Sequence, residues 1–184
     1  NSLMTGLIYR SMMLCHAMIY NYPESIRYGK LAYDAFICAG ENRYVDYMLL
    51  SLGNMYYSMK DYMEAKKMFA TSFRMGKETE DLNLVMRSLE GYALALKSEK
   101  TEERLQLMTQ IVEYIEDSLQ FVPSPRILAG YAVCNVEHNN ITKAKALMNK
   151  AKGYKTVPAD DSLYVRFAEY QINKLSGDFE SAVD

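Results

Sequence analysis

The sequence predicts an all-α protein built from repeated pairs of antiparallel helices. Small residues recur at intervals of about forty, at Gly53, Ala93 and Ala132, and large apolar residues flank each of them at helical spacing. The composition agrees with a folded helical chain, because 49% of the 184 residues are hydrophobic and only 4 are prolines. A small residue lets two helix axes approach to about 8 Å, so we expect these three positions to lie at helix crossings.

The helix pair is clearest near the middle of the first half of the chain. Its first helix carries large residues around a small one, and its second helix carries residues that can pack against the first. This copy consists of Leu49, Leu52, Gly53 and Tyr56, followed by Ala65, Phe69 and Ser72. The skeleton returns as Leu89, Tyr92, Ala93 and Leu96, and then as Leu128, Tyr131, Ala132 and Asn135 with Ala144, Met148 and Ala151. We expect burial around the crossings at Tyr56, Phe69, Leu96 and Met148.

Fainter copies extend the array in both directions. Met13 lies about forty residues before Gly53, and Ala168 follows Ala132 at a similar distance. Five helix pairs are expected, the last one incomplete, near residues 5–40, 45–80, 85–121, 124–157 and 160–184. Because no long polar linker interrupts them, we expect a single domain over residues 1–184. The chain begins and ends inside repeats, which predicts a fragment of a longer protein.

Caps and helix breakers place the limits of the individual helices. Pro23 begins the second helix, with Asn21 or Tyr22 near its cap, and polar turns at 60–62 and 77–80 separate the next helices. Thr101 opens the sixth helix, and acidic residues in its first turn suit the helix dipole. The later breaks fall at residues 123–125, 139–142, 153–158 and 177–179, the last of them before the small Ala182.

This pattern resembles the tetratricopeptide repeat, a helix-turn-helix unit with large residues around a glycine or alanine in its first helix. The match is strongest over residues 46–77. The chain departs from the family pattern at Met13, Gly29, Leu105 and Thr109. The period of about forty, against about 34 in the standard unit, resembles the longer variant found in kinesin light chain and in several bacterial regulators.

The resemblance implies a right-handed superhelical solenoid of about four and a half to five repeats. In this family the first helices of the pairs line a concave face that binds extended peptides or helices. Members that bind chaperones clamp a C-terminal carboxylate with Lys, Asn and Arg side chains. Leu50 stands where such a clamp would have lysine, so this specialisation is not expected here.

Projection away from the helix-pair core selects candidate groove residues on the first helices. The polar and aromatic candidates are Tyr47, Asn54, Tyr57, Arg87, Glu90, Lys97 and Arg126, and the apolar ones are Leu50, Leu94, Ala129, Val133 and Val136. Arginine forks recognise carboxylates, and an asparagine amide can contact a peptide backbone. An internal salt network, with Glu90 paired to Arg87 or to Arg126, is the alternative that the sequence leaves open.

Other functional classes find little support. The net charge of −2 produces no field for nucleic acid, and no apolar stretch is long enough for a membrane span.

Cys134 and His138 share a helical face and could supply half a zinc site, but two further ligands would be needed. A buried thiol and a helix-end histidine explain the pair more simply. The paired acids at 102–103 and 160–161 suit helix starts, and no glycine-rich phosphate loop occurs. We expect no metal, no cofactor and no enzymatic activity.

The function hypotheses therefore concern binding. The first is capture of a protein or peptide in the concave groove, with the sensing or adaptor part of a bacterial regulator suggested by analogy to long-repeat family members. The second is self-assembly through the terminal repeats, and the third is a metal-binding protein that uses Cys134 and His138. Three cysteines favour a reducing, cytoplasmic compartment, and an extracytoplasmic segment of a membrane-anchored protein stays open.

Overall fold

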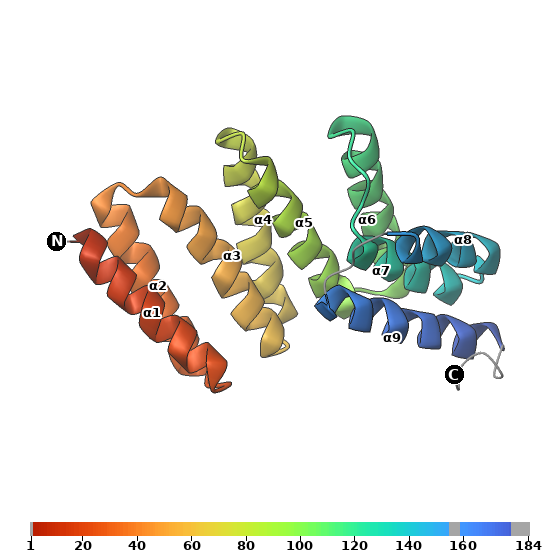
Figure 1. Cartoon of the computed structure of the whole chain (residues 1–184), viewed down its shortest axis with the longest axis horizontal. Helices are drawn as coiled ribbons and strands as arrows, with labels where there is room; N and C mark the ends of the chain where they lie inside the picture. Colours follow the sequence, from red (N-terminus) through yellow and green to blue (C-terminus); the bar gives the residue numbers. More distant parts are fainter. Residues whose placement is uncertain (1, 155–158, 178–184) are drawn as a thin grey trace. The chain divides into compact units, whose positions relative to one another are not determined.

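The computed structural model describes residues 2–154 and 159–177, and every regular segment within them is helical (Figure 1). The all-α prediction is therefore confirmed. The chain divides into two compact units, Asn1–Ser98 and Glu99–Asp184. We call them unit 1 and unit 2. Their boundary falls inside the predicted third helix pair, at residues 85–121, and a single domain over residues 1–184 stays a prediction.

Unit 1 consists of two antiparallel helix pairs and a further helix. Its elements are α1 (Ser2–Met18), α2 (Tyr22–Ala39), α3 (Asn42–Ser58), α4 (Tyr62–Glu78), α5 (Leu82–Ala95) and a 3₁₀ turn (Leu96–Ser98). In Figure 1, α1 pairs with α2, α3 pairs with α4, and α5 lies against α4. The helices α1, α3 and α5 begin at residues 2, 42 and 82, so the sequence period is retained in the structure.

A left-handed residue closes each of the first four helices. Tyr20, Gly40, Lys60 and Glu80 have φ angles of 58°, 71°, 64° and 54°. The next residue caps the following helix, and its side chain accepts a backbone hydrogen bond at Asn21, Asp61 and Asp81. These caps reverse the chain within two or three residues, which is why neighbouring helices are antiparallel.

The ring of Phe69, from α4, lies at the centre of the unit 1 core and is 1% exposed. A Cβ atom added at Gly53 of α3 would lie 2.7 Å from its Cε1 atom, and one added at Gly91 of α5 would lie still closer. Only glycine leaves room for the ring at these two positions. The crossing at Gly53 is confirmed. The crossing predicted at Ala93 is wrong, because Ala93 is only half-buried and α5 makes its close approach through Gly91.

In the first helix pair the large and the small residue at the crossing have changed places, compared with the second pair. Met13 of α1 occupies the position of Gly53, and Gly29 of α2 occupies that of Phe69. A Cβ atom at Gly29 would lie 3.1 Å from the sulfur of Met13, which is 1% exposed. Leu52 of α3 lies closer still, with its Cδ2 atom 2.7 Å from that position, so Met13 and Leu52 together fill the space beside Gly29.

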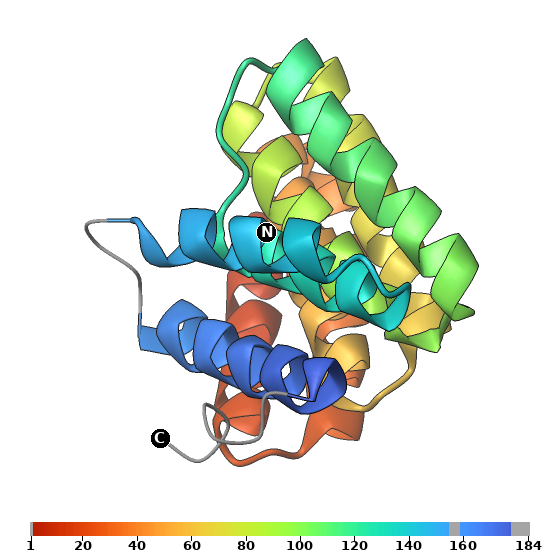
Figure 2. The same ribbon diagram turned by 90° about the vertical axis from the view of Figure 1, so that its right-hand side faces the viewer.

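The described residues of unit 2 form four α-helices. They are α6 (Thr101–Glu113), which continues into a π-helical turn (Tyr114–Ser118), α7 (Pro125–Glu137), α8 (Ile141–Lys152) and α9 (Ala159–Ser176). Helix α7 packs against α6, α8 and α9, and Figure 2 shows α8 and α9 in front. Its small residues Ala129 and Ala132 are fully buried beside Ala144 and Met148 of α8. The second helix of the predicted fifth pair, with Ala182, lies outside the described residues.

The predicted core residues are largely confirmed. Phe69, Leu96 and Met148 are buried, and Tyr56 is half-buried at the edge of the unit 1 core. Among the helices of residues 2–154 and 159–177, none combines the length and the apolar character needed to cross a membrane.

Replacing Gly53 with leucine should destabilise the protein by about 1 to 3 kcal/mol or more, because its side chain would overlap the Phe69 ring. Leucine is the better helix former, so helix propensity alone would produce the opposite sign. Denaturant unfolding measures the difference. The matched control is Asn54→Leu, at the exposed neighbouring position, which should change the free energy of unfolding by no more than about 0.5 kcal/mol. An unchanged stability of Gly53→Leu would contradict the observed packing.

Asp46 places a carboxyl group in the core of unit 1. Asp46 is 5% exposed, and its Oδ1 atom has no hydrogen-bond partner among the described residues. Burial raises the pKa of this carboxyl above its ordinary value, and the negative charges of Asp81 and Glu78 raise the pKa further. Folding therefore favours the protonated form.

Asp46→Asn should increase the stability at pH 7 and should have little effect at about pH 3. The folded pKa is raised, so the favourable contribution of Asp46 is complete below the unfolded pKa of about 3.9 and is lost as the pH rises through the folded pKa. Denaturant unfolding of the wild type, Asp46→Asn and the exposed control Asp34→Asn at both pH values measures this. A variant that is less stable than the wild type at pH 7 would contradict the burial of an unpartnered carboxylate.

Candidate functional site

A hollow of about 620 Å³ lies on unit 1, between its odd-numbered helices. It is lined by Arg10 of α1, by Glu41 at the cap of α3, by Arg43, Tyr44, Tyr47 and Ser51 of α3, and by Arg87 of α5. We call this site the arginine hollow. Two of the predicted groove residues, Tyr47 and Arg87, meet here. They are forty residues apart, so the repeat period brings equivalent faces of α3 and α5 together.

The arginine hollow carries an excess of positive charge. Its three arginines and one glutamate leave a net charge of +2 on the lining. Within the described part of the chain, none of Arg10, Arg43 and Arg87 forms an ion pair with another residue. The three guanidinium groups therefore keep their donors available to an anion.

The aromatic and hydroxyl groups of the hollow are held in place by their neighbours. The Tyr44 ring stacks on Phe36 of α2, with 4.8 Å between ring centroids and 16° between planes. The Ser51 hydroxyl donates a hydrogen bond of 2.9 Å to the carbonyl oxygen of Tyr47. These contacts fix the wall of the hollow on α3 and leave the arginines as its main donors.

Ten residues further along α3, Tyr57 contacts Lys97 of the 3₁₀ turn that follows α5. The Lys97 ammonium donates a hydrogen bond of 3.1 Å to the hydroxyl of Tyr57 and lies 5.7 Å from the ring centroid. Tyr57 and Lys97 are again forty residues apart. Of the predicted polar residues between the hollow and this contact, Asn54 is exposed on α3 and Glu90 is half-buried on α5. The ion pair between Arg87 and Glu90, which the sequence left open as an alternative, is absent among the described residues.

Three of the apolar groove residues were predicted wrongly. Leu50, Ala129 and Val136 are 3%, 0% and 6% exposed and belong to the cores of their units. They lie at the edge of the projected helix face, where the neighbouring helix covers them. Leu94 and Val133 are half-buried.

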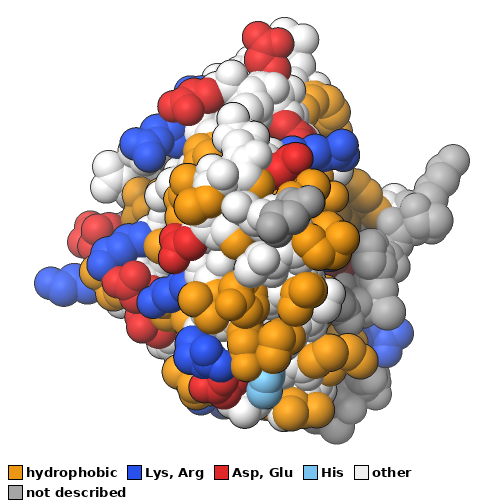
Figure 3. All heavy atoms as spheres, turned by 90° about the vertical axis from the view of Figure 1, so that its left-hand side faces the viewer, with side chains coloured by type: hydrophobic (Ala, Val, Ile, Leu, Met, Phe, Trp, Pro, Cys, Tyr) orange, Lys and Arg blue, Asp and Glu red, His pale blue; other side chains and the backbone are white. Residues whose placement is uncertain are grey.

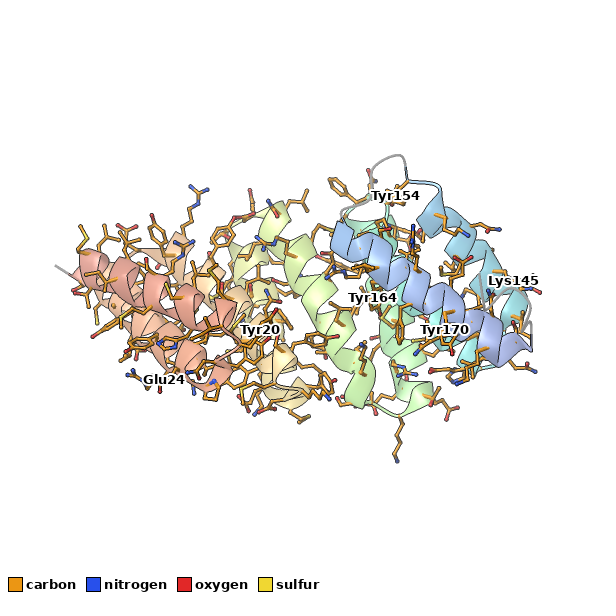
Figure 4. All side chains as sticks on the ribbon, turned by 60° about the horizontal axis from the view of Figure 1, so that its bottom comes forward. Tyr20, Glu24, Lys145, Tyr154, Tyr164 and Tyr170 are labelled. Atoms are coloured by element: carbon orange, nitrogen blue, oxygen red, sulfur yellow. The ribbon has the colours of Figure 1, made fainter. Side chains whose placement is uncertain are left out.

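Arg126 belongs to unit 2 and has a partner there. Its guanidinium lies 2.5 Å from Oδ1 of Asp161 on α9, and the two side chains are 26% and 16% exposed. The guanidinium also lies 6.0 Å from the ring of Tyr164, which projects from α9 (Figure 4). From the sequence we expected Asp161 to lie at the start of a helix and Arg126 to line the concave groove. The structure instead joins them in an ion pair between α7 and α9.

Sequence reasoning missed Arg10 and Arg43, two of the three basic side chains of the hollow. Neither lies at the groove position occupied by Arg87, so the repeat register did not select them. Net charge per helix holds no signal for them, because α4 is more positive than α1, α3 or α5. What the three arginines share is only that they come from odd-numbered helices.

Cys134 and His138 lie on one face of α7, but the histidine ring contacts the backbone. Its Nδ1 atom lies 3.0 Å from the carbonyl oxygen of Cys134. The thiol is buried, and burial raises its pKa above the ordinary value, which disfavours the thiolate that zinc requires. In the described residues no group of three or more metal-ligating side chains gathers.

Arg126→Ala should lower the free energy of unfolding by about 1.5 to 3 kcal/mol, because it leaves the half-buried Asp161 without its charged partner. Arg87→Ala, which removes an exposed and unpaired side chain of the hollow, should change it by less than about 0.5 kcal/mol. Denaturant unfolding of both variants measures the contrast. Equal effects would show that Arg126 is not part of the scaffold.

The comparisons with known proteins show the fold. No protein-family profile matches the chain, and no curated protein matches its sequence. A solved structure, that of aspartyl phosphate phosphatase F from Bacillus subtilis, aligns with a TM-score of 0.77 and 18% sequence identity. The alignment covers 100% of this chain and 48% of the phosphatase, so the chain spans about half the length of that protein. The likeness supports an all-α, tetratricopeptide-like fold of repeated helix pairs.

Proposed function

We propose that unit 1 binds an extended, acidic segment of a partner protein or peptide along α3 and α5. The observation that carries this proposal is the arginine hollow, in which three arginines share one concavity with a single glutamate and none of them forms an ion pair with another described residue. Exposed arginines that face a common space repel one another, and an anionic ligand relieves that repulsion.

The distance along α3 from the arginine hollow to the contact of Tyr57 with Lys97 sets the length of the bound segment. Tyr47 and Tyr57 are ten residues apart on one helix, which corresponds to about 15 Å along its axis. An extended chain covers that distance with about four to five residues. The acidic end would lie in the arginine hollow, Asn54 would face its backbone, and the Tyr57 ring would contact its other end. In this proposal Arg126 is part of the unit 2 scaffold and takes no part in binding.

The biological setting is proposed from the fold. The similar structure is named an aspartyl phosphate phosphatase, and that activity belongs to that protein. For this chain we propose a sensing or adaptor segment of a bacterial regulator, which binds a partner and performs no catalysis itself. Assignment to the long-repeat variant of the tetratricopeptide family is part of this proposal, as is the absence of nucleic-acid binding.

A peptide-display selection with the full 184-residue chain tests the proposal. The selected peptides should be enriched in Asp and Glu, and their affinity should fall as ionic strength rises. Arg87→Ala should weaken their binding at least about tenfold, because it removes one of the charges that hold the anion.

The matched control is Arg74→Ala, which removes an exposed arginine of α4 outside the arginine hollow. It should bind the selected peptides as the wild type does. Peptides whose affinity is the same in the wild type and in Arg87→Ala would place the binding site elsewhere and overturn the proposal.

Self-association is the second candidate function. Helix α1 exposes a stripe of apolar side chains at helical spacing, with Met4, Ile8 and Met12 exposed by 57%, 53% and 36%. Figure 3 shows apolar side chains gathered on this side of unit 1. A helix that exposes such a stripe can pack against a second copy of the chain. A molecular mass that stays monomeric in sedimentation up to high protein concentration would contradict this candidate.

A further inference from the structure

We infer that the anion held in the arginine hollow is a phosphate group, carried by a side chain of the bound segment. The inference rests on the proposed function and makes it more specific, because it names the group through which the segment is anchored. It follows from three properties of the hollow: its charge, its number of donors and its volume.

The charge of the hollow matches a phosphate monoester better than a carboxylate. The lining carries a net charge of +2, with Glu41 already counted. A phosphorylated side chain carries about −1.5 to −2 charges at pH 7, whereas a carboxylate carries one. A single carboxylate would thus leave part of the positive charge of the hollow uncompensated.

The donors of the hollow lead to the same group. Each guanidinium offers five N–H donors in a planar fork that suits phosphate oxygens. One arginine satisfies a carboxylate in a bidentate contact, and with the charge of Glu41 counted the lining would still keep one uncompensated positive charge. Three arginines from three different helices can instead approach the three terminal oxygens of a phosphate from different sides. Ser51 does not compete as a donor, because its proton is directed to the Tyr47 carbonyl oxygen.

The surroundings of the hollow support the same assignment. The first turn of α3 borders it through Arg43 and Tyr44, so the positive end of that helix dipole adds to the potential. The volume of about 620 Å³ is much larger than a phosphate group, and it leaves room for the residue that carries the phosphate. Tyr44 and Tyr47 form an aromatic wall against which the neighbouring residues of the segment can pack.

Three oriented peptide libraries test the inference on the full chain. They share random flanks and differ only in the fixed central residue, which is phosphoserine, glutamate or serine. The phosphoserine library should bind at least about tenfold more tightly than the glutamate library, and the serine library should bind most weakly. Binding of the phosphoserine library should weaken below about pH 6, where the phosphate takes up its second proton.

Variants and a competitor distinguish the possible sources of the anion. Arg43→Gln and Arg87→Gln should each reduce binding of the phosphoserine library at least about tenfold, while Arg74→Gln should not change it. Circular dichroism of each variant checks that the fold is retained. Inorganic phosphate should compete with the phosphoserine library for the wild type. If it binds as tightly as the phosphopeptides, the hollow holds a free phosphate and the assignment to a partner segment is wrong.

The two proposals fail in different ways. Equal binding of the phosphoserine and glutamate libraries, with both lost in Arg87→Gln, would overturn the phosphate inference and retain the acidic segment. Binding of any library that is unaffected by Arg43→Gln and Arg87→Gln would remove the binding site from the arginine hollow, and with it both proposals.

Discussion

The contact of two glycines with one phenylalanine ring governs the arrangement of unit 1. Gly53 of α3 and Gly91 of α5 both face the ring of Phe69, and neither position has room for a side chain. Both helices therefore approach the same ring of α4, and because short turns make each of them antiparallel to α4, they run in the same direction. Their register brings residues forty positions apart face to face, as in the contact of Tyr57 with Lys97 and in the shared lining by Tyr47 and Arg87. The arginine hollow thus depends on a packing constraint in the core beneath it.

The same constraint explains why much of the fold was predictable from sequence. A glycine or alanine at a helix crossing has few substitutes, so its recurrence at a fixed spacing identified Gly53 and Ala132 correctly. Turns were predictable for a similar reason, because capping requires polar side chains such as that of Asp61. The turn predicted at 77–80 lies slightly later in the structure, where Asp81 caps α5. Prediction failed at Ala93 because α5 contains two small residues close together, Gly91 and Ala93, and the periodicity alone does not decide which of them meets the ring. Met13 and Gly29 were departures when considered separately. In the structure Met13 packs beside Gly29, together with Leu52 of α3.

The candidate site was predictable only in part, because the helical period does not tell how many residues beside the buried stripe are covered by neighbouring helices. Tyr47, Asn54, Tyr57 and Arg87 lie on α3 and α5, Lys97 lies in the 3₁₀ turn that follows α5, and Leu50 is buried. Pairings between charges are harder still. Asp161 lies far from Arg126 in sequence, and no local pattern predicts their ion pair. Arg10 and Arg43 were missed for the opposite reason, since each looks like an ordinary exposed residue until three helices bring it beside Arg87.

The functional account depends on the binding of an anion by the three arginines of the hollow. Nuclear magnetic resonance of the arginine side chains tests that binding most directly. The Nε–H signals of Arg10, Arg43 and Arg87 should shift together as an acidic or phosphorylated segment is added. Those of Arg27, which is paired with Glu24 at 2.8 Å, and of Arg74 should stay unchanged. Shifts confined to residues of unit 2 or to the apolar stripe of α1, with the three arginines unaffected, would contradict the account.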